Sequence, residues 1–335
     1  MKTLIIGGTG VISTSIVDAL NASNHNVTVF NRGFRPVRYK QKVNAIYGDK
    51  KDKRRFFCTM KPLKFDCVID MISYNENDAA DTLNAFDGED THFIFTSTTS
   101  TYKRPTSRPI IETDALCDTD DINPYGFHKA NMEHYLNQKS SEGVKITIIR
   151  PSLTYGIGCR NIGPMRNNYG IVKRIQENKP VVNFGDGTNP WAWTFAPDLA
   201  KAYVGAMGRE KCYGQTYHAT SYDIHIWDDL FLGFGHLIGV EPKILHMSTE
   251  MLMLAAPEQF LHVSQEKMYS GIFDNSKIKR DIPEFVCGYS LYKILKSIYS
   301  WYMSDSRART VDEKLDKLED SLVDKYYKCV GILRG

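Results

Sequence analysis

Two short segments of this 335-residue chain carry residues whose types and spacing suit hydride transfer. Near the N-terminus, an apolar run leads into the glycine-rich turn Gly7–Gly10 and then into a helical pattern. Backbone N–H groups and the positive helix end at such a turn can hold a dinucleotide pyrophosphate. Far downstream, Tyr125 and Lys129 stand one helical turn apart. Together the two segments predict a dinucleotide-dependent enzyme.

Tyr125 and Lys129 form a candidate acid-base pair. A nearby ammonium and a positive nicotinamide ring both favour the phenolate, which lowers the pKa of a tyrosine toward that of a general base. A third component is the strand Phe93–Thr96, which runs into a row of hydroxyl residues beginning Ser97-Thr98-Thr99. A hydroxyl at this strand end can hydrogen-bond the substrate oxygen that gains or loses a proton.

The glycine turn predicts the pyrophosphate site in more detail. Gly7 makes the turn, Gly10 lets the backbone approach the phosphates, and Val11 and Ile12 open the helix. At the third glycine position stands Ser13, which is small enough for a helix to pack on a strand. Its hydroxymethyl group costs some fit without excluding the site.

The end of the second strand predicts which dinucleotide binds. NAD-specific folds usually carry an acidic residue there, whereas this chain has Asn31 and Arg32. Asn31 removes a charge that would repel a 2′-phosphate, and Arg32 offers a bidentate cation. NADP is therefore favoured over NAD, the alternative being that Arg32 stacks on adenine or faces solvent. Asp49 could accept hydrogen bonds from the adenine amino group or serve only as a turn former.

Alternating apolar runs and helical patterns in the first half predict an α/β fold, a Rossmann-type doubly wound parallel sheet. Strands are expected at Leu4–Ile6, Val27–Phe30, Val43–Tyr47, Cys67–Met71, Phe93–Thr96 and Ile146–Ile149, and helices at Ser13–Asn21, Arg54–Met60, Ala79–Ala85 and Tyr125–Asn137. We expect residues 1–150 to bind the dinucleotide. Residues 151–304 should be mainly a smaller substrate-binding lobe with segments returning to the sheet, and 305–335 a helical extension.

The second half of the chain is less regular. The segments Gly156–Tyr169 and Val181–Trp193 are rich in Gly, Pro and Asn and are expected to be pocket-building loops. Trp191 and Trp193 in the second of them could stack on a sugar or base, or be packed inside. Helices are expected at Ile226–Ile238 and Ser290–Met303. An apolar stripe from Val311 to Leu322 predicts a helix packed on the body or on a second subunit.

Composition narrows the class of protein. Lys and Arg outnumber Asp and Glu by only 42 to 39, so no charge excess predicts a nucleic acid or a membrane as partner. The seven cysteines are scattered, which argues against a disulfide framework or a zinc site. The first strand begins almost at Met1, and no apolar run is long enough to span a membrane. We expect a soluble, cytoplasmic protein.

Motifs in order along nearly the whole chain resemble the extended short-chain dehydrogenase/reductase superfamily, in its NAD-dependent epimerase/dehydratase branch. They are the turn Gly7–Gly10, Gly48-Asp49, the strand ending Thr96-Ser97-Thr98, Tyr125 with Lys129, Arg150-Pro151, Tyr155-Gly156, Gly185-Asp186-Gly187-Thr188 and Asp198-Leu199-Ala200. The resemblance implies that Tyr125 is the base, that Lys129 holds the nicotinamide ribose, and that Thr98 holds the substrate oxygen. Ser97 or Thr99 remains an alternative for Thr98.

Departures from the family pattern narrow the reaction. Members that dehydrate sugars resemble one another in placing acidic residues after the catalytic Ser or Thr, whereas Thr99-Ser100 follows here, so dehydration is disfavoured. Leu153 stands where nucleotide-sugar enzymes often have Asn, and no Arg lies near Trp193. Cations that could replace that arginine are Arg160, Arg166, Lys173 and Arg174.

The resemblance thus implies an NAD(P)-dependent epimerase of a sugar-like substrate and, among such substrates, favours a nucleotide sugar. The substrate pocket should include Thr98, Thr99, Tyr125, Leu153, Trp191 and Trp193. One alternative is an NADPH-dependent ketoreductase, and another is a non-catalytic dinucleotide-sensing or RNA-associated protein on the same fold. The resemblance further implies a homodimer formed through the helices at 125–137 and 79–85.

Overall fold

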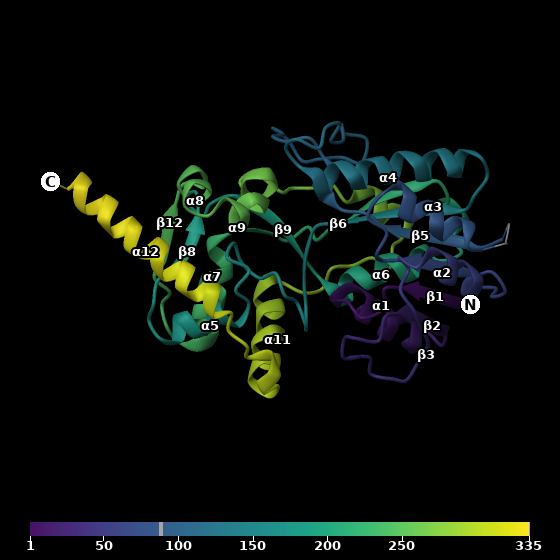
Figure 1. The fold of residues 1–335 in the computed structure, drawn as a ribbon, viewed down its shortest axis with the longest axis horizontal. Coiled ribbons are helices and arrows are strands. Elements are labelled where there is room, and N and C mark those ends of the chain that lie inside the picture. The colour runs from purple at the N-terminus through teal and green to yellow at the C-terminus, as the bar shows by residue number, and fades with distance from the viewer. Residues whose placement is uncertain (87–89, 335) are drawn as a thin grey trace.

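The structure, a computed structural model, describes residues 1–86 and 90–334 and sets a parallel sheet beside a smaller lobe (Figure 1). Within the described residues, seven strands form the main sheet in the order β10-β6-β5-β4-β1-β2-β3, and all neighbours are parallel. The strands are β1 (Lys2–Ile6), β2 (Asn26–Asn31), β3 (Asn44–Tyr47), β4 (Cys67–Asp70), β5 (His92–Thr96), β6 (Ile146–Pro151) and β10 (Gln215–Ala219).

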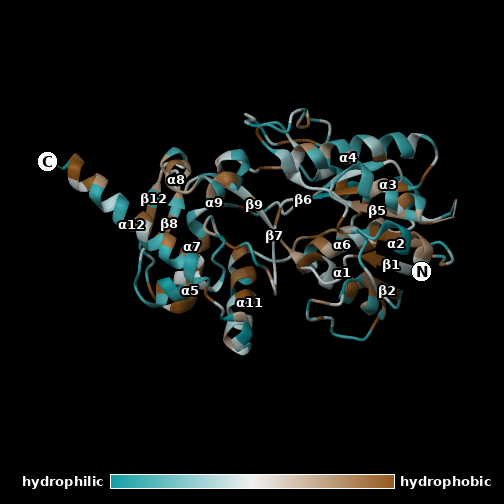
Figure 2. Ribbon diagram, viewed as in Figure 1, coloured by the Kyte–Doolittle hydropathy of each residue, from teal (hydrophilic) through white to brown (hydrophobic). Residues whose placement is uncertain are grey.

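Helices cover both faces of this sheet. One face packs on α1 (Val11–Ala22), α6 (Ala196–Ala206) and α10 (Ser276–Asp281), and the other on α2 (Lys53–Met60), α3 (Glu76–Asn84) and α4 (Pro124–Ser141). Alternation along the strands explains this sandwich, since Ile5 faces the first group while Leu4 and Ile6 face the second. The hydrophobic residues accordingly gather on the central strands in Figure 2. The doubly wound Rossmann-type fold predicted from the sequence is confirmed.

The sequence located the strands of the first half to within one or two residues. Their apolar runs are unambiguous because every strand between its neighbours is buried on both faces. The strand order reverses between β1 and β4. In doubly wound sheets a ligand binds at such a switch point, outside the carboxyl ends of the strands.

The smaller lobe has its own hydrophobic core and two short sheets. Its strands are β7 (Leu153–Tyr155), β9 (Pro190–Phe195) and β11 (Ile224–Ile226) in one sheet, and β8 (Val181–Phe184) and β12 (Ile244–Met247) in the other. Its helices are α5 (Tyr169–Gln176), α7 (Asp228–Ile238), α8 (Thr249–Ala255), α9 (Pro257–His262) and α11 (Leu291–Ser304). The prediction of a loop over Val181–Trp193 is therefore wrong, because both its ends are strands and only the segment between them turns.

The C-terminal helix α12 (Glu313–Leu333) leaves the lobe and extends away from the body (Figure 1). Its first half is attached through the buried side chains of Leu322 and Val323 and through Glu319, whose carboxylate accepts a hydrogen bond from the Val182 amide at 2.8 Å. Among the described residues, no helix combines the length and apolar character needed to cross a membrane.

Candidate active site

A cleft of about 1310 Å³ opens at the carboxyl ends of the strands, between the sheet and the smaller lobe. It brings together most of the residues singled out from the sequence, although they come from distant parts of the chain. Those that line it are Gly7, Gly10, Val11, Ile12, Asn31, Arg32, Asp49, Thr98, Tyr125, Lys129 and Leu153. Thr99, Trp191 and Trp193 are not part of its wall.

The glycine turn is shaped for close approach by a ligand. Gly7 has a φ of +91°, and a Cβ at this position would lie 2.3 Å from Cγ2 of Ile72, so only glycine fits. The next turn begins α1, whose first amides, at Val11 and Ile12, have no acceptor within the helix. The positive end of a 12-residue helix therefore faces the cleft.

Ser13, which stands in place of the third glycine, is 1% exposed and is used by the fold. Its hydroxyl accepts a hydrogen bond from the Gly10 amide at 2.8 Å, which caps the helix. The serine thus packs where a glycine would, and its hydroxyl satisfies the amide of Gly10 in the turn.

The part of the cleft wall beside β2 and β3 carries Asn31, Arg32 and Asp49. The side-chain oxygen of Asn31 accepts a hydrogen bond from the Gly33 amide at 2.8 Å, and Asp49 accepts one from the Lys51 amide at 3.0 Å. Arg32 and Asp49 are about half exposed and 3.9 Å apart, so a weak and replaceable ion pair holds the guanidinium at the cleft.

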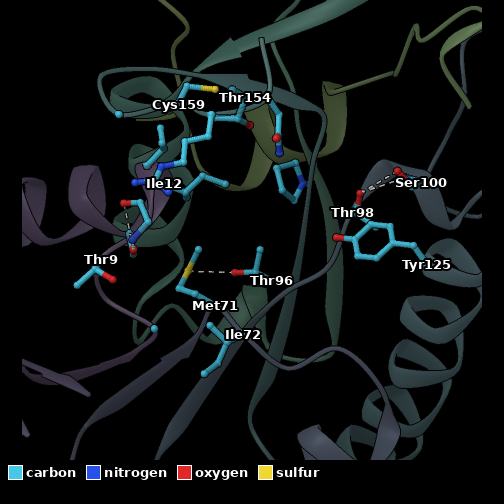
Figure 3. Close-up of a pocket in the computed structure, with 18 of the residues that line it drawn as sticks. Thr9, Ile12, Met71, Ile72, Thr96, Thr98, Ser100, Tyr125, Thr154 and Cys159 are labelled. Atoms are coloured by element: carbon cyan, nitrogen blue, oxygen red, sulfur yellow. Dashed lines mark hydrogen bonds between the residues drawn. The ribbon is translucent and has the colours of Figure 1, made fainter. Parts of the chain in front are cut away.

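The three hydroxyl residues after β5 take different directions. Ser97 is buried and donates a hydrogen bond to the carboxylate of Glu133. Thr99 is 2% exposed and lies off the cleft wall. Thr98 lies beside the hydroxyl of Tyr125 (Figure 3), and a hydrogen bond between them contributes to the pKa of the phenol.

Tyr125 and Lys129 both project from α4 into the cleft. Burial, together with the charge of Glu266, raises the pKa of Tyr125 to about 12, against the effect of the hydrogen bond with Thr98. The Lys129 ammonium donates to the carbonyl oxygens of Ser73 at 2.6 Å and Thr96 at 2.8 Å. Burial lowers the pKa of Lys129 to about 8. The tyrosine therefore needs a further positive charge before it can act as a base near neutral pH.

A buried ion pair beneath this site was missed from the sequence. Nζ of Lys50 lies 2.7 Å from the Asp70 carboxylate and donates to the Ser73 hydroxyl at 2.6 Å. Although burial opposes it, the charge of Lys50 lowers the pKa of Asp70 to about 2. Because Lys129 binds the carbonyl of Ser73, this cluster fixes the lysine from below. Two signals were available: Lys50 directly follows Gly48-Asp49, and Asp70 ends an apolar strand at the functional edge of the sheet.

The lobe supplies the opposite wall of the cleft. Of the four candidate cations, Arg160 and Arg166 line it, and neither guanidinium makes a hydrogen bond or ion pair within the described part of the chain. Arg174 is instead buried against the acidic face of α12, and Lys173 pairs with Glu177 on the surface. Two arginine side chains therefore line the part of the cleft wall that the lobe supplies, and the charge of Arg166 interacts with that of Glu266.

Trp191 and Trp193 require a correction. Trp191 is 0% and Trp193 1% exposed, and both belong to the core of the lobe. Trp193 stacks on Tyr155 with ring centroids 6.2 Å apart, so its face is already occupied. They serve packing and cannot stack on a sugar in this structure. No group of three His, Cys, Asp or Glu side chains in the described ranges is arranged to hold a metal ion.

Comparison with known proteins agrees with this architecture. Residues 3–218 match the model of the NAD dependent epimerase/dehydratase family. The chain is 25% identical over 240 residues to the 2′-dehydrokanamycin reductase of Streptomyces kanamyceticus, covering 71% of this chain and 67% of that protein. It is also 25% identical over 261 residues to the chloroplast stem-loop binding protein of 41 kDa b of Arabidopsis thaliana, covering 73% of this chain and 65% of the relative.

Solved structures show the same fold at low identity. A UDP-glucose 4-epimerase of Thermotoga maritima, solved with UDP-glucose, superposes with a TM-score of 0.72 at 18% identity, covering 91% of this chain and 99% of the other. A dTDP-glucose 4,6-dehydratase of Bacillus anthracis, solved with NAD, gives a TM-score of 0.74 at 14% identity, covering 92% and 98%.

Proposed function

This chain belongs to the NAD dependent epimerase/dehydratase family, and from that premise we propose that it is an epimerase of a sugar-like carbinol, most directly of a nucleotide sugar. As an extended short-chain dehydrogenase/reductase it is a nicotinamide-dependent enzyme. One observation carries the proposal: the hydroxyls of Thr98 and Tyr125 meet inside the cleft that the glycine turn also lines. An acid-base pair and a dinucleotide cradle in one cleft suit reversible oxidation of a carbinol.

The residues of the cleft fit a dinucleotide. Gly7 has no side chain to keep the pyrophosphate away from the backbone, and the amides of Val11 and Ile12 would hold that pyrophosphate. Lys129 would hold the nicotinamide ribose. When bound, the dinucleotide supplies hydride transfer. Arg32 beside Asn31 supports NADP as the preferred form, since an arginine can grip a 2′-phosphate and no acidic residue of β2 repels it.

The chain's own residues would move the proton. Thr98 donates a hydrogen bond to the substrate oxygen and holds it beside the phenol of Tyr125. As the phenolate, which the charge of Lys129 and the further positive charge of a bound oxidised nicotinamide would favour, Tyr125 takes the proton from the carbinol and returns it after the keto intermediate has turned. Arg160 and Arg166, on the opposite wall, would grip the diphosphate while the sugar ring changes face.

Two proteins of the same fold, solved in complex with UDP-glucose, support a nucleotide sugar as the substrate class. A test that needs no prior choice of substrate is native mass spectrometry of the purified protein, followed by release of any retained nucleotide. Because an epimerase regenerates its cofactor in each cycle, we expect a dinucleotide to copurify. A protein that retains none, and binds none when it is added, would contradict the proposal.

An NADPH-dependent ketoreductase is the second candidate. The relative from Streptomyces kanamyceticus is a reductase by name, and the half-exposed Arg32 could select NADPH from solution.

We also propose a homodimer through α3 and α4, which pack side by side on one face of the sheet, because a two-fold axis would pair the same helices from each subunit. Sedimentation at micromolar concentration tests this pairing.

A further inference from the structure

Glu266 is a buried carboxylate in the wall of the cleft that the proposed chemistry does not use. It lies in a π-helical turn of the lobe, Val263–Lys267, and is 8% exposed. Its Oε2 accepts a hydrogen bond from Nζ of Lys267 at 2.8 Å. Its Oε1 is buried and, within the described residues, has no hydrogen-bond partner of ordinary geometry.

The side chain is charged. Burial alone would raise its pKa, but the Lys267 ammonium, with help from Arg104 and Ser100, brings the pKa of Glu266 below its usual value. A buried carboxylate oxygen without a donor is unfavourable, and nearly all such atoms in proteins are satisfied by protein, water or ligand. Oε1 is therefore a buried acceptor without a donor at ordinary hydrogen-bond geometry, on a side chain that lines the cleft.

Glu266 also lies close to the reacting groups. Its negative charge raises the pKa of Tyr125, and a hydrogen bond from the Ser100 side chain helps to lower the pKa of Glu266. The Ser100 hydroxyl in turn lies 3.3 Å from Oγ1 of Thr98. If Thr98 and Tyr125 hold the oxygen on the reacting carbon of a substrate, the substrate atoms next to that carbon would lie near Glu266.

We propose that Glu266 accepts a hydrogen bond from the substrate hydroxyl on the ring carbon next to the carbinol that is inverted. The substrate class is accordingly a ring with two adjacent hydroxyls. Lys267 also belongs to the cleft wall, and its ammonium, 4.4 Å from the ring centre of Trp191, places a donor beside this acceptor. The pair can then serve the neighbouring hydroxyl in either orientation of the ring. This inference rests on the proposed function.

The rival explanation is that Glu266 only neutralises Lys267. A purely structural counter-ion would affect stability or every substrate alike, whereas a recognition group discriminates by one hydroxyl. The test therefore uses UDP-glucose, UDP-galactose, UDP-glucuronic acid and dTDP-glucose to find a sugar that the protein converts. It then compares that sugar with the analogue lacking the hydroxyl next to the inverted carbon.

In the native protein we expect the analogue to lose about 30- to 100-fold in kcat/KM, the usual effect of leaving a charged group unpaired. Glu266→Gln should lose at least about tenfold on the parent sugar and almost nothing on the analogue, so that discrimination collapses. The matched control is Glu250→Gln, an exposed carboxylate on α8 of the same lobe, which should keep native discrimination. Thermal unfolding confirms that each variant is folded.

Undiminished discrimination in Glu266→Gln, or less than threefold discrimination in the native protein, overturns the inference but leaves the proposed function standing. If Glu266→Gln does not fold, Glu266→Asp replaces it, because withdrawing the carboxylate by one methylene must weaken the same discrimination. A native protein that neither binds nor converts any of the four sugars overturns the proposed function, and the inference with it.

Discussion

The Ser97 hydroxyl donates a hydrogen bond to the buried carboxylate of Glu133, so that, although Ser97 and Thr98 both line the cleft, the Ser97 hydroxyl is already engaged. Glu133 is itself held by the guanidinium of Arg150, with Nε at 2.9 Å from one carboxylate oxygen. Adjacent residues in extended chain point to opposite sides, so fixing Ser97 on one side directs Thr98 to the other. The relation separates two hydroxyls that the sequence alone left as alternatives.

The first prediction follows from this division. Thr98→Ala should lower kcat about 100-fold without changing the unfolding temperature, because it removes a hydrogen bond made to the substrate oxygen. Ser97→Ala should keep kcat within a few-fold and lower the free energy of unfolding by about 2 kcal/mol, since a hydrogen bond to a buried charge is lost. Steady-state kinetics and denaturant unfolding of both variants check this. The reverse pattern would assign the substrate oxygen to Ser97.

A second prediction concerns Tyr125. Tyr125→Phe should reduce turnover by about three powers of ten or more, while a titration shows dinucleotide affinity nearly intact. The matched control is Tyr74→Phe, because the Tyr74 ring lies 5.8 Å from that of Tyr125 and its phenol is not part of the cleft wall. The control should turn over within about twofold of the native protein. Near-native turnover of Tyr125→Phe would remove the proposed mechanism.

What the sequence could supply was mainly local. Apolar runs and the glycine turn located the sheet, and the one-turn spacing located Tyr125 and Lys129 on a shared helix. The strands β8 and β9 were missed because the Gly- and Asn-rich turn between them outweighed short apolar runs at either end. The substrate role suggested for Trp193 failed because burial depends on the lobe's core, which no local pattern reveals.

Long-range contacts were beyond the sequence altogether. Glu266 enters the cleft from a turn far along the chain, and nothing in its neighbourhood marks it as part of the site. Asp70 and Lys50 meet only because β4 and β3 both end on the side of the sheet where the carboxyl ends of its strands lie. Ser13, which the sequence predicts only to cost some fit, caps α1 with its hydroxyl.

A third prediction concerns cofactor preference. Arg32→Ala should weaken NADP binding by about 2 kcal/mol, because a charge-assisted contact with the 2′-phosphate is lost, and should barely change NAD binding. The control is Arg35→Ala, which removes a neighbouring arginine of the same cleft wall. In this variant the loss of NADP affinity should differ less from the loss of NAD affinity than it does in Arg32→Ala. Calorimetric titration measures both. Equal losses of NAD and NADP affinity in Arg32→Ala would mean that Arg32 acts on the adenine or on the fold.

A fourth prediction uses the titration of Lys129. Burial lowers its pKa from 10.5 to about 8 in the folded protein. Between these values the folded protein binds fewer protons at this group than the unfolded chain, so its contribution to the free energy of unfolding increases as the pH rises. Relative to Lys129→Met, the native protein should gain about 2.5 kcal/mol between pH 7 and pH 10. Urea unfolding at both pH values measures this difference. A difference independent of pH would show that the lysine titrates as it does in water.

The fate of the hydride tests the central claim most directly. Nucleotide sugars are incubated with the protein and NADPH deuterated at the transferred position, and separately in deuterated water, and the products are analysed by mass spectrometry. An epimerase returns to the sugar the same hydride that it removed, so we predict an inverted product without label from the added cofactor and with no net nicotinamide absorbance change. Stoichiometric consumption of NADPH, with deuterium at the new carbinol carbon, would contradict the epimerase and establish the ketoreductase.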